Sequence, residues 1–70
     1  MNANTYNYAK RLINDLQALV KNQQTLTEWY SELSENDPFR NVLLEDLNAT
    51  AKAIDETSKR FKDFMSANNQ

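Results

Sequence analysis

Apolar side chains recur every three or four residues through both halves of the chain, which is the spacing of one face of an α-helix. In the first half the repeating positions are Ala9, Leu12, Leu16, Leu19, Gln23, Leu26, Tyr30 and Leu33. In the second half they are Phe39, Leu43, Leu44, Leu47, Ala51, Ile54, Ser58, Phe61 and Met65, with Phe64 alongside. No stretch alternates apolar and polar residues as a half-buried strand does. The pattern therefore predicts an all-α protein.

Helix-breaking residues gather at one place near the middle of the chain. There is no glycine, and the only proline, Pro38, follows the polar run 34–37. Asp37 suits the N-cap of a helix and Pro38 its first position, because the N–H that proline lacks would be unpaired there. We therefore predict one domain over residues 1–70. Its parts are a helix over about 5–34 with Thr5 as N-cap, a turn at about 34–38, a helix over about 38–66, and a frayed C-terminus at 67–70.

The two apolar stripes come into register if the second helix folds back antiparallel on the first. Residues whose numbers add to about 73 then face one another, and Gln23 meets Thr50 or Ala51. The apolar pairs include Leu12 with Phe61, Leu19 with Ile54, Leu26 with Leu47 and Tyr30 with Leu43. Because two stripes agree under one assumption, the sequence predicts an antiparallel helical hairpin.

A three-helix bundle is the alternative architecture. Residues 21–24 are wholly polar, and Thr25 followed by Glu28 matches a capping box. A break near 21–25 would let one chain wrap its own core. The apolar phase continues through the polar stretch, however, and this favours a single continuous helix.

Each predicted helix has an apolar arc that is wider than one neighbouring helix can cover. A chain of this length seldom gains more than about 3–5 kcal/mol from its own core, and this one has no cysteine or histidine for a disulfide or a structural zinc. A second hairpin would cover the arc and produce a four-helix bundle. We expect a homodimer of this kind, or a hairpin completed by another protein. The candidate contact residues are Trp29, Ile13, Val20, Leu44, Phe64 and Gln23.

Two of these candidates allow more than one interpretation. Trp29 lies at the edge of the stripe, where an indole either anchors a partner or packs against the edge of its own hairpin. Gln23 is an amide within an apolar stripe, so it either fixes the register of association or marks a loose, partly exposed waist.

The net charge of −2 hides an uneven distribution along the predicted hairpin. The acidic end, next to the turn, carries Glu28, Glu32, Glu35, Asp37, Glu45 and Asp46. The basic end, near the termini, carries Lys10, Arg11, Lys52, Lys59, Arg60 and Lys62, together with four acidic residues. This polarity would steer antiparallel self-association or a charged partner. The alternative explanation is that the charges of the second helix only complement its dipole.

The sequence offers little for catalysis, cofactor binding or metal binding. Histidine, the commonest general base, and cysteine, the strongest nucleophile, are both missing, as are the glycines of a phosphate-binding loop. We therefore predict no enzyme activity, no cofactor and no metal site. An acidic protein is a poor candidate for nonspecific nucleic-acid binding, and no segment is apolar enough to span a membrane. With no signal peptide evident and no cysteine, we expect a cytoplasmic location.

These observations favour a non-enzymatic protein–protein interaction module: a small adaptor, chaperone or inhibitor acting through its helical surface. In outline, the chain resembles Rop-type RNA-binding dimers and the short hairpin chaperones of type III secretion, and it is of the size that phages and bacteria often encode. The first resemblance implies the alternative of an RNA-binding regulator that uses the basic end. A structural subunit of a larger helical assembly is a further alternative.

Overall fold

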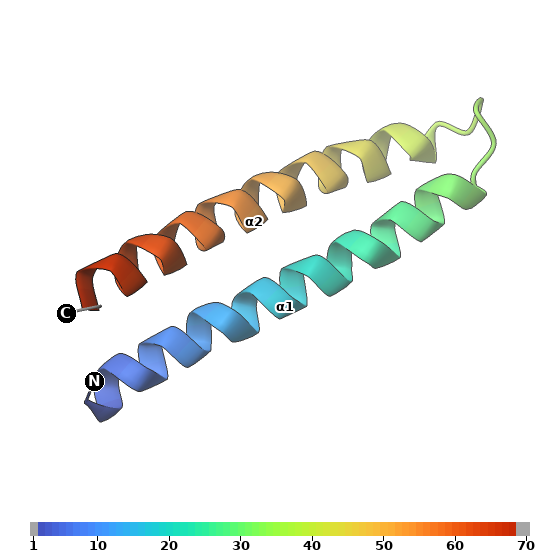
Figure 1. Cartoon of the computed structure of the whole chain (residues 1–70). Coiled ribbons are helices and arrows are strands. Elements are labelled where there is room, and N and C mark those ends of the chain that lie inside the picture. The colour runs from blue at the N-terminus through green and yellow to red at the C-terminus, as the bar shows by residue number, and fades with distance from the viewer. Residues whose placement is uncertain (1, 69–70) are drawn as a thin grey trace.

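The computed structural model describes residues 2–68, which form two α-helices joined by a short turn (Figure 1). Helix α1 spans Ala3–Glu32 and helix α2 spans Phe39–Asn68, and the two helices pack antiparallel with both termini at one end. None of these residues belongs to a strand. The predicted antiparallel helical hairpin is therefore confirmed.

Helix α1 runs without interruption through residues 21–25, so the three-helix alternative is wrong. The hydroxyl of Thr25 donates to the carbonyl oxygen of Lys21 at 3.1 Å, and the hydroxyl of Thr27 donates to that of Gln23 at 2.8 Å. Both threonines thus bond back to the preceding helical turn instead of capping a new helix.

The helix boundaries differ from the predicted ones by two residues at three places. The N-cap of α1 is Asn2 rather than Thr5, because the Asn2 side-chain oxygen accepts a hydrogen bond from the Thr5 N–H at 2.8 Å. Helix α1 ends at Glu32, before the predicted residue 34. Helix α2 continues to Asn68, so residues 67 and 68 are helical rather than frayed. The rest of the predicted frayed segment lies outside the described residues.

The turn closes without glycine because no described residue needs a positive φ. Leu33 leaves α1 in an extended conformation, with φ −83° and ψ 145°, and Asp37 donates its N–H to the carbonyl of Ser34 at 3.1 Å. A carboxylate oxygen of Asp37 then accepts from the Phe39 N–H at 2.9 Å. Asp37 is therefore the N-cap of α2, as predicted.

The core is a narrow seam between the helices. Leu12, Leu26, Leu43 and Thr50 are its buried residues. The less exposed positions of α2 pair with those of α1 as predicted, with residue numbers adding to about 73, but they differ from the predicted stripe. Arg40, Thr50 and Phe64 lie on the seam, whereas Phe39, Leu44, Ala51 and Met65 are exposed beside it.

Hydrogen bonding and aromatic contacts explain these corrections. The Thr50 hydroxyl donates to the carbonyl of Asp46 at 2.8 Å, so its burial leaves no unpaired polar group. The guanidinium of Arg40 lies 4.3 Å from the centre of the Tyr30 ring and donates to the Leu33 carbonyl at 3.4 Å. Arginine therefore fits the seam through its apolar stem and cation–π contact, although its charge places it outside any hydrophobic pattern.

Removing the cap of α2 should weaken the hairpin measurably. We expect Asp37→Ala to lower the free energy of unfolding by about 0.5–2 kcal/mol, because the Phe39 N–H loses its acceptor. Urea unfolding followed by circular dichroism measures the change. Asn36→Ala, one residue earlier, is the matched control and should leave the midpoint nearly unchanged; equal losses in both variants would contradict the capping role.

Candidate interaction surfaces

The hairpin is a single layer of two helices, and both of its broad sides are open. Its Cα extents are 53 × 16 × 12 Å. A helix pair usually belongs to a structure with a second layer, because each apolar stripe needs cover. Large apolar side chains accordingly stay 41–59% exposed; they are Tyr6, Tyr8, Ile13, Val20, Trp29, Phe39, Val42, Leu44 and Met65.

The position of each exposed residue relative to the seam shows which broad side it occupies. Ile13 and Val20 each directly follow a seam leucine of α1, and Leu44 directly follows the buried Leu43 of α2. Half a turn about an axis perpendicular to the hairpin plane relates two antiparallel helices, so equivalent positions of both helices lie on the same broad side. The residues that directly follow the seam form two rows on this side. The first row is Tyr6, Ile13, Val20, Thr27, Leu44, Ala51, Ser58 and Met65, and the second is Lys10, Gln17, Gln24, Ser31, Asn41, Asn48, Asp55 and Lys62. We call the first row the lateral stripe; none of its members is charged, whereas the polar row beside it contains three charged residues.

The opposite broad side has a different composition. Trp29 and Phe39 each directly precede a seam residue, which places them on this side, near the turn. The equivalent positions farther along include Asp15, Asp46 and Arg60, so charges interrupt the apolar surface. We call Trp29 and Phe39, together with the adjacent acidic residues Glu32 and Asp46, the turn patch.

Phe64 and Gln23 are the predicted contact residues that do not lie on an open face. Phe64 is half-buried, and its ring centre lies 5.2 Å from that of Tyr8, so it closes the open end of its own hairpin. Its placement beside the seam was therefore wrong. Gln23 lies half-buried on the seam, as its place in the stripe predicted. The predicted contact residues did not include five members of the lateral stripe, although their offset of one residue from the seam would have identified them: Tyr6, Thr27, Ala51, Ser58 and Met65.

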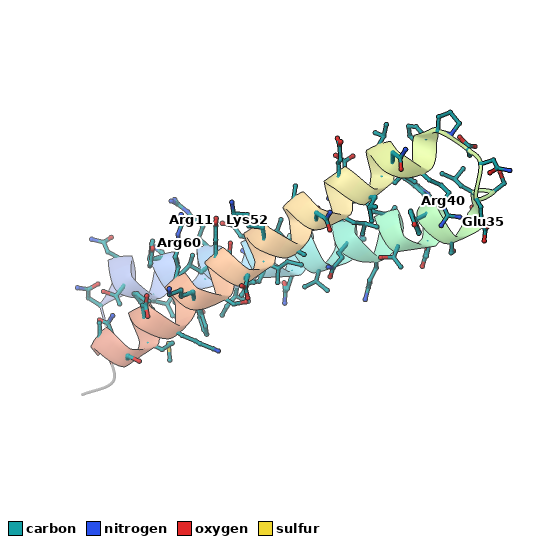
Figure 2. All side chains as sticks on the ribbon, turned by 90° about the horizontal axis from the view of Figure 1, so that it is seen from above. Arg11, Glu35, Arg40, Lys52 and Arg60 are labelled. Carbon is teal, nitrogen blue, oxygen red and sulfur yellow. The ribbon has the colours of Figure 1, made fainter. Side chains whose placement is uncertain are left out.

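The charged residues are distributed broadly as predicted. Figure 2 shows Glu35 and Arg40 at the turn, with Arg11 and Arg60 in the half near the termini. Lys52 lies closer to the middle of α2 than to the basic end that the sequence assigned to it. Every residue that was assigned to the acidic end or the basic end is exposed except Asp37, which is half-buried as the N-cap of α2.

A shallow hollow with polar residues around it lies on α1. Gln23, Gln24, Thr27 and Glu28 line it. A site for catalysis usually brings a nucleophile, a base and an orienting group together, and this hollow holds one carboxylate and two amides. Within residues 2–68 there is no cluster of His, Cys, Asp or Glu that could hold a metal ion, and no buried side-chain nitrogen or oxygen lacks a hydrogen-bond partner.

Neither described helix contains a segment that is long and apolar enough to cross a membrane. Comparison with protein-family models, curated proteins and solved structures finds no match to this chain.

Proposed function

We propose that this chain is a non-enzymatic protein–protein interaction module whose main working surface is the lateral stripe. The observation that carries the proposal is a row of uncharged side chains along both helices, of which all but the half-buried Ser58 are exposed. Interface cores are depleted of charge, and an apolar surface of this length on a small protein is typical of a site that another protein covers. The partner is a second copy of the chain, another protein, or both. The cytoplasmic location stays a prediction from the sequence.

The RNA-binding alternative has weaker support. Phosphate recognition needs a concentrated basic surface, but the basic residues share their half of the hairpin with Asp15, Asp55, Glu56 and Asp63. A structural role in a larger assembly would use the same lateral stripe and would differ mainly in the lifetime of the complex.

The test places one negative charge on the lateral stripe. Val20→Asp puts a carboxylate at its centre, while Ala18→Asp puts the same charge on a neighbouring exposed position outside it. Both positions are exposed, so both variants should keep their helix content. We expect Val20→Asp to weaken protein binding by at least about tenfold, because a buried unpaired charge is costly, and Ala18→Asp to bind like the parent.

Two measurements compare binding by the parent and the two variants. Sedimentation reports self-association, and pull-down from the native host, compared between parent and variants, reports binding to other proteins. Equal binding by all three proteins would contradict the role of the lateral stripe. Titration with generic RNA at increasing salt tests the alternative, because binding through phosphates falls steeply with salt concentration.

A further inference from the structure

We propose that the lateral stripe docks a second copy of this chain in antiparallel order, so that the turn of each hairpin lies beside the termini of the other. This inference rests on the proposed function and names its partner. The outline of this face suits such a dimer: its Cα extents of 53 Å by 16 Å span about 850 Å², so a second hairpin covering the whole face would approach the roughly 800 Å² per partner that standard interfaces bury.

Two hairpins stacked on the same face with two-fold symmetry, and with their helices running along one another, can be arranged in two ways. With the axis along the bundle, the hairpins are parallel and α1 lies over α2 of the second copy. With the axis across the bundle, they are antiparallel and each helix lies over its own copy. The charges that flank the lateral stripe distinguish these arrangements.

The parallel arrangement brings like charges together at both ends. Residues at the same level of the hairpin would face each other across the interface, so Lys10 would meet Lys62 of the second copy and Glu28 would meet Glu45, each pair occurring twice. Like charges across an interface are unfavourable.

The antiparallel arrangement separates the like charges at both ends. Lys10 then meets Gln24 of the second copy, and Lys62 meets Asn48. Two kinds of like-charge contact remain among these flanking positions: Asp55 meets its own copy at the axis, and Lys52 meets Lys59 of the second copy, one helical turn from Asp55.

The stripe residues also match one another in antiparallel order. The midpoint of the stripe lies between Ile13 and Val20 on α1, so each of these residues meets the other on the second copy. On α2, Leu44 meets Met65, and the small residues Ala51 and Ser58 meet at the centre, where they allow close approach.

In this arrangement the exposed ring of Tyr6 lies opposite the polar hollow on α1 of the second copy. Tyr6 is the most exposed large apolar side chain of the described residues, at 59%. In antiparallel order it meets Thr27 of the second copy, which lines the hollow together with Gln23, Gln24 and Glu28. The ring would fill the hollow, and Lys10, one turn after Tyr6, would approach its polar rim. Because the same four residues would receive Tyr6 in both copies, the surface is complementary to itself.

Engineered cysteines test the order directly, because the chain has no cysteine of its own. Gln17 lies beside the proposed axis, so Gln17→Cys should form a disulfide with its own copy, which requires Cα atoms about 4.4–6.8 Å apart. Gln24→Cys alone should remain monomeric on a non-reducing gel, since its two copies lie about 22 Å apart along the helices. The double variant Lys10→Cys with Gln24→Cys should crosslink, and it cannot close within one helix because its positions are about 21 Å apart.

We expect Gln17→Cys to crosslink at least about tenfold faster than Gln24→Cys under mild oxidation, because pre-association raises the effective thiol concentration. Formation of a disulfide-linked dimer when the two single variants Gln24→Cys and Asn48→Cys are mixed, without crosslinking of Gln17→Cys, would establish the parallel order and overturn the proposal. A monomer by sedimentation at micromolar concentration would also overturn it. In that case, loss of another protein's binding in Val20→Asp would still support the interaction module, so the two proposals can fail separately.

Discussion

Replacing Leu43 by alanine should abolish the folded hairpin at micromolar concentration. Leu43 is 2% exposed, and it is the one large side chain of residues 2–68 that is fully buried. Truncating a buried leucine costs about 2–5 kcal/mol, whereas a core of this size supplies about 3–5 kcal/mol in total. The variant should therefore show a largely unfolded circular dichroism spectrum under conditions in which the parent is helical.

The control is the preceding residue. Val42 is 48% exposed and lies on neither the seam nor the lateral stripe. Val42→Ala should change stability by less than about 0.5 kcal/mol, and in the stabilising direction, because alanine is the better helix former. Both variants should be compared at several protein concentrations, since stability rises with concentration where folding is coupled to association. A loss below about 1 kcal/mol for Leu43→Ala would mean that the seam is not the main core.

The fold could be predicted from sequence because helix periodicity and turn chemistry pointed to the same answer. The break at Asp37 and Pro38 located the turn, and the unbroken apolar phase through residues 21–24 outweighed the capping-box pattern at Thr25. A capping box competes with continuation of the helix, and a threonine hydroxyl that bonds back to the previous turn is equally compatible with continuation.

The parts that sequence reasoning missed depend on how individual side chains satisfy their polar groups. A ranking by hydropathy places Phe39 on the seam and Arg40 outside it, yet the Tyr30 ring and the Leu33 carbonyl make the arginine the better fit. The same ranking favours Ala51 over Thr50, although the Thr50 hydroxyl is satisfied within its own helix. The lateral stripe depends on these choices, because a shift of one residue moves a side chain about 100° around the helix.

Trp29→Ala should weaken binding of a partner other than a second copy by about 2 kcal/mol or more, which is about thirtyfold in Kd, while leaving helix content and self-association unchanged. The indole is 53% exposed and lies in the turn patch, on the broad side opposite the lateral stripe. Exposed tryptophan is costly to leave in water and is enriched at binding hot spots. Glu32 and Asp46 beside it would steer a basic partner.

Tryptophan fluorescence can report on this site, because Trp29 is the only tryptophan in the chain. Association through the lateral stripe should leave its fluorescence emission maximum constant as protein concentration rises, whereas burial by a partner should shift the maximum to shorter wavelength. Trp29→Phe should retain much of the affinity that Trp29→Ala loses, and Glu32→Gln should slow association without removing apolar contact area. Arg40 is unsuitable as a charge control, because its guanidinium stacks on Tyr30 within the seam. A shift of the emission maximum when the protein self-associates without any other partner would place the dimer interface on the turn patch. This result would contradict the assignment of one surface to the second copy and another surface to a different protein.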